Sequence, residues 1–519
     1  MQRRRRLTAR IGASITPFLI AASAVAQTGQ PAGKQPATSN QLPLSGRTGQ
    51  NGSVTATESP VPGTTTSVNT INPSVQVQGP YAGSAQSRPP FSGKLSLREA
   101  VERALRYNLG SIGVSQAVEQ ARGQTRVARS APLPNVNGNL SENIEQRNLA
   151  AQGLRFNVPS FSGAPGIPSV VGPFNYFDLR ATLSQTVVDL TARNNYSAAK
   201  ESLRANELSA RDARDLVVFA VGGAYLQVIA AAARVVSAHA QLDTANALYQ
   251  QTSQQRAVGL VAQIDVNRSR VQMLTQQQRL VSLENDLAKQ KINLARITGL
   301  PPTDRYDLAD DIPFAAPPAI NAEEAVHQAF GQRSDLRAAE AQVRAAERAL
   351  SAARAERLPS LSVSADYGAI GMNPAQAHGT FSVAGSLKFP IWQGGRIEGD
   401  IQQGGAALAQ RRAELEDLQG QVEADVRKAY LDVEAARSQV DVARENIQVT
   451  QDNLKLTRQR FEAGVTDNLI VVQSQESVAE AELDYINSVF AHNVAKLSLA
   501  RAIGRAADDL PRFLQVQPR

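Results

Sequence analysis

Residues 360–367 read Ser-Leu-Ser-Val-Ser-Ala-Asp-Tyr, and residues 381–389 read Phe-Ser-Val-Ala-Gly-Ser-Leu-Lys-Phe. In both segments, apolar residues or glycine alternate with mostly polar ones, and residues 135–141 and 177–184 repeat the pattern. Such alternation predicts four strands with one apolar and one polar face, as expected for lipid outside and water inside a membrane-spanning barrel. An amphipathic sheet on a soluble core would show the same pattern.

Four strands are too few to close a barrel, because spanning barrels need about eight or more. An open sheet edge in lipid would leave backbone groups unpaired, at a cost of several kcal/mol each. If the strands span a membrane, the barrel must therefore be shared between chains. This closure argument permits two chains as well as three.

A long helix is predicted over residues 408–461, about 80 Å at 1.5 Å per residue. Its seam alternates steps of four and three, the period of a coiled coil. The seam consists of Val422, Val426, Ala429, Val433, Ala436, Val440, Ala443 and Ile447. An ordinary coiled-coil stalk would fit this helix alone. The alanines, however, permit close packing on more than one neighbour, as a ring of helices requires.

The chain contains an apparent internal duplication. Glu-Ala-Val at 99–101 recurs at 324–326, which defines a first spacing, and Ala-Tyr-Leu at 224–226 recurs at 429–431, which defines a second, shorter spacing. The difference places about 20 extra residues in a Gly/Pro-rich loop at 150–173 of the first repeat. The predicted segments are a first repeat at 95–300, a Pro-rich connector at 301–320, a second repeat at 321–505 and a C-terminal tail at 506–519.

The N-terminus predicts export. Residues 1–26 combine five arginines, an apolar stretch and an Ala-Val-Ala end, which is typical of a signal peptide cleaved after Ala26. Residues 27–91 are rich in Thr, Ser, Gly, Pro and Gln, a composition that predicts a disordered leader. No run of 18 or more apolar residues is expected after the signal, so transmembrane helices are not predicted.

Charge and cysteine content exclude several function classes. The formal net charge of +7 falls to +2 without the five signal-peptide arginines, so no nucleic-acid-binding face is implied. The chain has no cysteine, and therefore neither a disulfide framework nor an N-terminal lipid anchor on Cys. The four histidines are scattered and read as helix-surface residues, which leaves no catalytic, cofactor or metal site: His239, His327, His378 and His492.

Short motifs over residues 95–505 resemble the outer-membrane efflux protein, or TolC, family. Leu-Pro-Ser-Leu at 358–361 fits the family's helix-to-strand junction, and Phe-Pro-Ile-Trp-Gln-Gly-Gly-Arg at 389–396 fits its strand-to-helix junction. Val-Gly-Leu-Val-Ala at 258–262 and Arg-Phe-Glu-Ala-Gly-Val-Thr at 460–466 fit its two helix-turn-helix tips. The first repeat departs from the family at its strand-to-helix junction, where Thr186 and Asp189-Leu190-Thr191 replace a Pro and a Gly-Gly. This departure predicts a stiffer junction in the first repeat.

The resemblance implies an α+β membrane protein, a homotrimer that shares a transmembrane β-barrel in outer-membrane lipid and continues it as a long periplasmic α-helical barrel. It implies the passive exit duct of a tripartite efflux or type I secretion system. The partners would be a periplasmic adaptor and an inner-membrane transporter of the RND, ABC or MFS class. The expected adaptor-docking residues are Val258, Gly259, Leu260, Val261, Phe461, Gly464, Val465 and Thr466.

The resemblance also implies that polar residues near the tips close the periplasmic mouth. The candidates are Asp265, Arg268, Arg460, Asp467 and Gln473. Asp265 lies where the family carries an acid, so Asp265→Ala is expected to raise the resting conductance. Its counterpart at the second spacing is Ile470, so the cation preference of the mouth is expected to be weak.

Two other classes compete with the duct. A trimeric adhesin also shares a barrel of four strands per chain, but it carries these strands in one C-terminal block. A periplasmic enzyme or soluble scaffold would be a monomer that needs no detergent. The two separated strand pairs favour the duct.

Overall fold

The predicted seam is the buried side of α7 (Arg396–Glu462), a helix of 67 residues. Its buried residues include the seam from Val422 to Ala443, and Ile447 is half-buried. No proline occurs between Pro390 and Pro511, so every residue of the helix keeps its backbone N–H. The predicted long helix is confirmed, and it begins earlier than Leu408.

The structure is a computed structural model that describes residues 54–61, 70–85, 91–153, 168–311, 314–315, 321–514 and 517–518. All of these belong to one unit, residues 51–519. The predicted signal peptide at 1–26 and its cleavage site lie outside the described residues.

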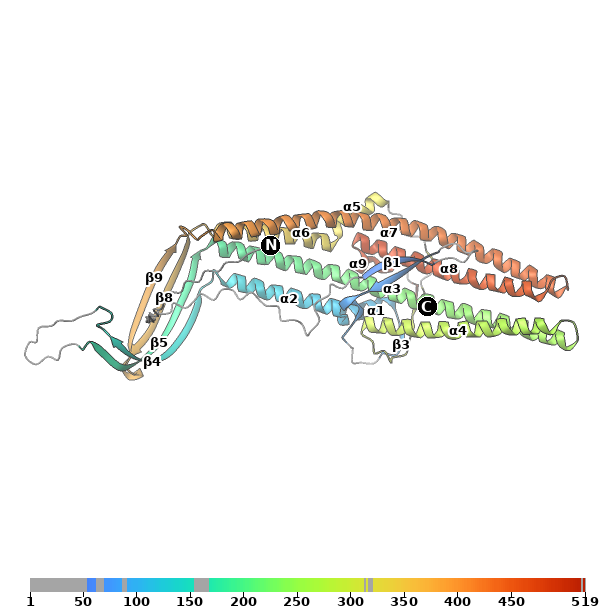
Figure 1. The fold of residues 1–519 in the computed structure, drawn as a ribbon, viewed down its shortest axis with the longest axis horizontal. Helices are drawn as coiled ribbons and strands as arrows, with labels where there is room; N and C mark the ends of the chain where they lie inside the picture. Colours follow the sequence, from blue (N-terminus) through green and yellow to red (C-terminus); the bar gives the residue numbers. More distant parts are fainter. Residues whose placement is uncertain are drawn as a thin grey trace, which may run out of the picture. The chain divides into compact units, whose positions relative to one another are not determined.

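All four predicted strands form one antiparallel sheet (Figure 1). They are β4 (Asn135–Asn148), β5 (Val170–Val188), β8 (Ser360–Gly371) and β9 (His378–Lys388), in the spatial order β4-β5-β8-β9. Three of them extend beyond the predicted limits, and β9 begins earlier and ends one residue sooner. The sheet leaves β4 and β9 as its two edges.

The register gives the sheet one apolar and one polar face. Leu140 lies opposite Leu179, and Tyr367 lies opposite Phe381, so apolar side chains share a face across neighbouring strands. These side chains are exposed: Leu140 by 65%, Tyr367 by 71% and Phe381 by 77%. An exposed apolar sheet face of this kind requires either lipid or a partner to cover it.

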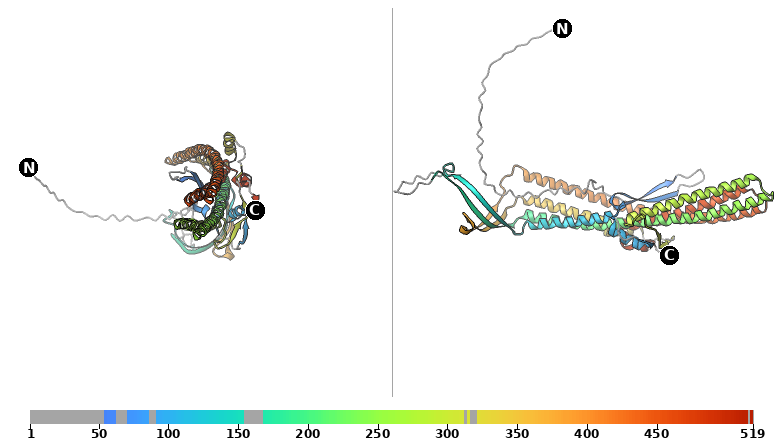
Figure 2. Two further views of the ribbon diagram at one scale, coloured as in Figure 1. Left: turned by 90° about the vertical axis from the view of Figure 1, so that its right-hand side faces the viewer. Right: turned by 90° about the horizontal axis from the view of Figure 1, so that it is seen from below.

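Four helices continue the strand order. Contacts join α2 (Leu109–Ser130) to α3 (Leu190–Ala257), α3 to α6 (Ser334–Ala355) and α6 to α7. Each helix is adjacent in sequence to one strand, so helix order and strand order agree. In end view the long helices form a curved layer (Figure 2).

Two helical hairpins extend away from the sheet. The first pairs α3 with α4 (Gln263–Thr298), and the second pairs α7 with α8 (Asn468–Ile503). The sheet lies at one end of these helices and the two hairpin turns lie at the other (Figure 1).

Helix boundaries repeat at the two spacings found in the sequence. The bounds of α1 (Leu97–Tyr107) and α5 (Ala322–Gln332) differ by the first spacing, as do those of α2 and α6. The bounds of α4 and α8 differ by the second spacing. Both α4 and α8 end at a glycine in the left-handed region, Gly299 and Gly504.

The main core lies between the sheet and the turns. An apolar stretch of α3 packs there against α1, α4, α8 and the parallel strands β3 (Gly93–Leu95) and β6 (Tyr306–Leu308). The hydroxyl of Tyr225, fully buried in α3, donates to the carbonyl of Leu95 at 2.9 Å. The C-terminal helix α9 (Ala506–Leu514) completes this core, so the predicted tail contributes to packing.

No unbroken run of 18 apolar residues follows the signal, because Gln227 interrupts the most apolar stretch of α3, but the mean hydropathy of that stretch is nevertheless high. In α3 an 18-residue window reaches a mean hydropathy of 2.0, which is long and apolar enough by composition to cross a membrane. Of that window, 67% is buried inside the protein. Residues such as Val217, Val221 and Val228 are fully buried in the main core, and this burial accounts for the apolar run.

The prediction of a disordered leader at 27–91 is wrong for its described part. Residues of the leader form an antiparallel hairpin of β1 (Val54–Val61) and β2 (Thr70–Val77), followed by the short helix η1 (Gly79–Ala82). Val54 and Tyr81 are buried in the main core. The connector at 301–320 contains β6 and a second short strand, β7 (Asp310–Asp311), which pairs with β10 (Gln517–Pro518) of the tail.

Candidate functional site

The turn between α3 and α4 is shaped by one glycine. Gly259 has φ +81°, a region in which residues with a side chain are strained. Its N–H donates to the carbonyl of Arg256 at 3.0 Å, and the N–H of Leu260 donates to the carbonyl of Gln255 at 2.9 Å. The helix-turn-helix expected at 258–262 is therefore present, between the end of α3 and the start of α4.

The turn between α7 and α8 repeats these contacts at the second spacing. Gly464 has φ +69°, and its N–H donates to the carbonyl of Phe461 at 3.0 Å. The N–H of Val465 donates to the carbonyl of Arg460 at 2.9 Å. Both hairpins therefore end in the same backbone arrangement.

The two turns present apolar side chains to solvent. Val258 is 71% exposed, Leu260 75% and Val465 66%. Val261, Phe461 and Thr466 are half-buried beside them. The predicted docking residues thus lie at the ends of the hairpins, and Val258, Leu260 and Val465 are the most accessible apolar side chains among them.

The predicted gate residues are not joined in one network. Asp265 and Arg268 form an ion pair within α4 at 3.5 Å. The carboxylate of Asp467 caps α8 by accepting from the N–H of Ile470 at 3.3 Å. Arg460 on α7 and Gln473 on α8 are exposed near the turns. The structure therefore brings Asp265 and Arg268 together and assigns Asp467 a capping contact.

One residue linking the hairpins was missed from the sequence. Asn468 is only 1% exposed, and its side-chain Nδ2 donates to the backbone carbonyl of Asp265 at 3.0 Å. This bond joins α8 to α4. A polar residue at the first position of a helix is usually exposed to solvent. Only the contact between the hairpins shows that Asn468 is buried and joins them.

Buried hydroxyl pairs hold each hairpin together near its turn. Thr252 and Ser269 lie 2.6 Å apart between α3 and α4. The hydroxyl of Ser474 donates to that of Thr457 at 3.3 Å between α7 and α8. Both members of each pair are related to their counterparts by the second spacing, so the two hairpins share this polar contact.

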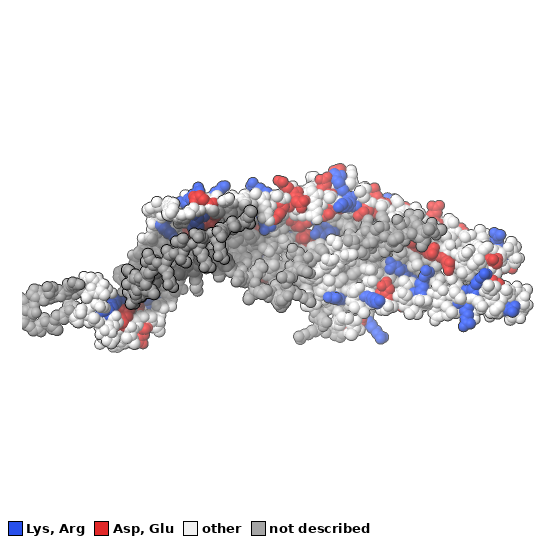
Figure 3. Space-filling model, viewed as in Figure 1, with Lys and Arg blue, Asp and Glu red and all other residues white. Residues whose placement is uncertain are grey.

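Charges of both signs are spread over the helical part of the molecule. On the face shown in Figure 3, lysines and arginines alternate with aspartates and glutamates, and neither sign dominates. Ion pairs join neighbouring helices, for example Arg344 with Glu201 at 3.0 Å between α6 and α3. Such a surface gives no indication of nucleic-acid binding.

A polar cavity of about 200 Å³ lies between the two hairpins. Its lining includes Gln272, Gln276 and Gln475, which are almost fully buried and have amide atoms without a hydrogen-bond partner among the described residues. Arg458 and Glu482 also line it. The packing between the hairpins is therefore less apolar than the core around α3.

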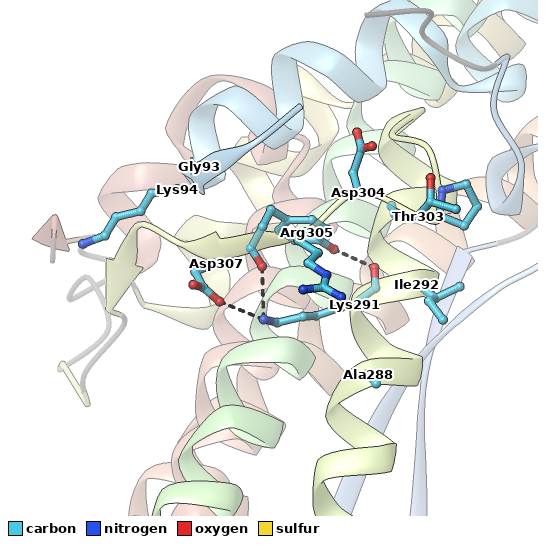
Figure 4. Close-up of a pocket in the computed structure, with 12 residues that line it drawn as sticks. Gly93, Lys94, Ala288, Lys291, Ile292, Thr303, Asp304, Arg305 and Asp307 are labelled. Carbon is cyan, nitrogen blue, oxygen red and sulfur yellow. Dashed lines mark hydrogen bonds and ion pairs between the residues drawn. The ribbon is translucent and has the colours of Figure 1, made fainter. Parts of the chain in front are cut away.

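A larger cavity of about 630 Å³ lies beside β3 and β6, where α4 passes them (Figure 4). The Nζ of Lys291 donates to the carbonyl of Tyr306 at 3.1 Å and pairs with Asp307 at 2.9 Å. The hydroxyl of Tyr306 donates to the carbonyl of Lys291 at 2.6 Å. These contacts tie α4 to β6 at the edge of the cavity.

The prediction that all histidines lie on helix surfaces is wrong for two of them. His378 begins strand β9, and His492 is fully buried in α8. Burial, together with nearby Lys496 and Arg437, lowers the pKa of His492 to about 4. Burial also lowers the pKa of Lys496 to about 8, and its Nζ donates to the carbonyl of Ala315 at 3.2 Å. Among the described residues, no cluster of His, Asp or Glu is arranged to hold a metal ion.

Comparison with known proteins places the chain in a family. The family model described as "Outer membrane efflux protein" matches residues 114–300 and 325–505. Outer membrane protein OprJ of Pseudomonas aeruginosa is 25% identical over 427 residues, covering 80% of this chain and 85% of OprJ. Pyoverdine export outer membrane protein OpmQ of Pseudomonas putida is 25% identical over 451 residues, covering 84% and 92%.

Solved structures show the same fold. The Campylobacter jejuni CmeC outer membrane channel has a TM-score of 0.67 at 18% identity, covering 79% of this chain and 86% of CmeC. The outer membrane protein VceC of Vibrio cholerae has a TM-score of 0.66 at 19% identity, covering 79% and 96%. The comparisons do not support the adhesin alternative. The chain belongs to the outer membrane efflux protein family, and it is a channel protein of the outer membrane with a large periplasmic helical part.

Proposed function

We propose that three copies of this chain form a continuous passive duct, with the sheets joined into one barrel and the helices into one tunnel. The observation that carries this proposal is the pair of open edges, β4 and β9. An isolated four-stranded sheet with an exposed apolar face would leave both edges unpaired in lipid. Joining β4 of one copy to β9 of the next removes every edge.

The helices support the same assembly. Because their order follows that of the strands, α2 and α7 form the two edges of the helical layer. The two repeated spacings favour an origin by internal duplication, with halves at 95–300 and 321–505. Three copies would give twelve strands and twelve helices around one lumen.

The exposed apolar turns support docking of a periplasmic adaptor. Val258, Leu260 and Val465 lie at the hairpin ends, where a partner can cover them. The adaptor would connect the duct to an inner-membrane transporter that supplies the energy. One relative is named for pyoverdine export and another, FusA of Burkholderia cepacia, for fusaric acid resistance, which favours small organic molecules as cargo.

The absence of cysteine permits a clean test of the shared barrel. One cysteine is placed on β4, at position 136, 138 or 140, and one on β9, at position 383, 385 or 387. Oxidation of the membrane-inserted protein should give a ladder of covalent dimers and trimers for the pairs in register. Cysteines at Ser184 and Ser364, which lie opposite each other on β5 and β8, should crosslink only within a chain.

The mass of the detergent-solubilised protein provides the second measurement. A complex of three chains is expected. A monomer in detergent, without ladders for any β4 and β9 pair, would refute the shared duct.

A further inference from the structure

The polar face of the sheet carries one charged cluster that joins three strands. Arg180 on β5 pairs with Asp366 on β8 through Nη1 at 2.7 Å, and with Asp178 of its own strand through Nε at 3.3 Å. The hydroxyl of Ser382 on β9 donates to Asp366. We call Asp178, Arg180 and Asp366 the charged belt. Elsewhere this face is mainly Ser, Asn, Thr and Gln along the strands.

A glycine makes room for the belt. The register places Gly368 of β8 directly opposite Arg180, and Gly368 is buried although it lies on an open sheet face. A methyl group at position 368 would lie 3.0 Å from Cβ of Arg180 and 2.4 Å from the carbonyl oxygen of Leu179. The arginine side chain can therefore lie close to β8 and reach Asp366 two residues away.

The belt has an excess of negative charge. It combines two carboxylates with one guanidinium. The exposed fraction of the side chain is 20% for Asp178, 29% for Arg180 and 18% for Asp366. They are therefore in contact with the solvent along this face. Nearer the far end of β4, Glu145 and Arg147 neutralise each other at 2.6 Å.

The next fixed positive charge on this face is too far away to cancel the excess. Lys388 ends β9, six residues beyond Ser382, which corresponds to roughly 20 Å along a strand. Charges in contact with solvent are screened over about 8 Å at physiological salt. The field near the belt is therefore set by its own residues.

We propose that the charged belt selects permeant ions inside the strand lumen, favouring cations and positively charged solutes over anions. This inference rests on the proposed function, because it requires the polar face to line a water-filled duct. Three chains would place three such clusters around one lumen, with one excess negative charge each. Rings of carboxylates confer cation preference in membrane channels.

Two variants with opposite charge changes test the proposal in planar bilayers under a KCl gradient. Arg180→Gln changes the belt from one to two excess negative charges, and should raise the ratio of K⁺ to Cl⁻ permeability by about twofold or more. The double variant Asp178→Asn with Asp366→Asn leaves one excess positive charge, and should shift the reversal potential the other way.

Two controls separate charge from packing. Glu142→Gln removes a carboxylate at the same height on the opposite, apolar face, since Glu142 lies opposite Phe177, and it should leave the reversal potential unchanged. Arg180→Lys keeps the charge and should retain the selectivity of the parent protein. A Lys variant that behaves like Arg180→Gln would overturn the electrostatic account.

The outcomes distinguish this inference from the proposed function. If the parent protein forms ion-conducting pores but both charge variants keep its reversal potential, the belt does not select ions. If the purified parent protein forms no pore, the duct itself is refuted. Retention of the assembled mass in detergent identifies the variants that fold.

Discussion

Replacement of Asn468 by alanine should weaken the contact that holds the two hairpins together. The side chain is 1% exposed and donates to the carbonyl of Asp265 at 3.0 Å, so it links α8 of one hairpin to α4 of the other. By contrast, the carboxylate of Asp265 forms its ion pair with Arg268 of its own helix, at 3.5 Å. The structure therefore ranks Asn468 above Asp265 as a residue that holds the hairpins in place.

The expected size follows from one buried hydrogen bond. Loss of such a bond costs about 1 kcal/mol, and each kcal/mol changes an equilibrium constant by roughly fivefold. If the hairpins of three assembled chains separate together, the effect reaches about 3 kcal/mol, or on the order of a hundredfold toward the separated arrangement. The carbonyl of Asp265 also loses its partner, which adds to the destabilisation.

Single-channel recording in planar bilayers measures this effect as the resting conductance and the fraction of time spent open. Asn468→Ala should raise both, and Asn468→Asp should do the same because a carboxylate cannot donate to the carbonyl. Asp265→Ala is the matched control, since it keeps the backbone carbonyl, and should change them less. Equal behaviour of Asn468→Ala and the parent protein would contradict the role of this bond, as would a larger effect of Asp265→Ala.

Three further changes have expected outcomes. Gly223→Ala would place a methyl group 2.4 Å from Val75, so it should release the leader hairpin and speed proteolysis within β1 and β2. Gly405→Ala is the control, because the space around Gly405 is open, and it should leave the rate of proteolysis unchanged. Gly504→Ala forces a side chain to φ +82° and should cost about 1–2 kcal/mol, measured as a lower melting temperature. The pKa of His492 is about 4 in the folded state and 6.5 in the reference state, so the stability of the folded protein should fall as pH drops from 6.5 to 4. In thermal melts over this pH range, the fall in melting temperature should be smaller for His492→Phe.

The strands and the long helices were predictable because apolar residues recur at regular intervals within each continuous segment. Alternation in 360–367 gave the two sheet faces, and steps of four and three from Val422 to Ala443 gave the buried side of α7. Strand length was underestimated in β4, which continues to Asn148 through polar residues such as Glu145. Those residues pair with β5 through backbone hydrogen bonds, which the side-chain pattern does not report.

Contacts between distant segments could not be read from the sequence. The leader has few large apolar residues, yet Val75 fits against Gly223, a residue far along the chain whose missing side chain makes the space. Asn468 likewise looked like an ordinary residue at the start of a helix, and only Asp265 on the other hairpin gives it a role. The tips were located from the motifs at 258–262 and 460–466 that resemble those of the family, but the pairing between hairpins required the structure.

The two strand-to-helix junctions differ in their capping contacts and backbone conformation. In the first half, Asp189 follows β5 directly and its carboxylate accepts from the N–H groups of Thr191 at 2.8 Å and Ala192 at 3.1 Å, which fixes the start of α3. In the second half, several residues separate β9 from α7, and Gly394 and Gly395 adopt φ +61° and +83° without a side-chain cap. Since a capped junction permits fewer backbone conformations than a glycine pair, we expect α3 to be tied to the sheet more rigidly than α7. We therefore expect relative movement of the two hairpins to be accommodated at the β9 junction rather than at the β5 junction, because the two halves of the chain differ where the sheet joins the helices.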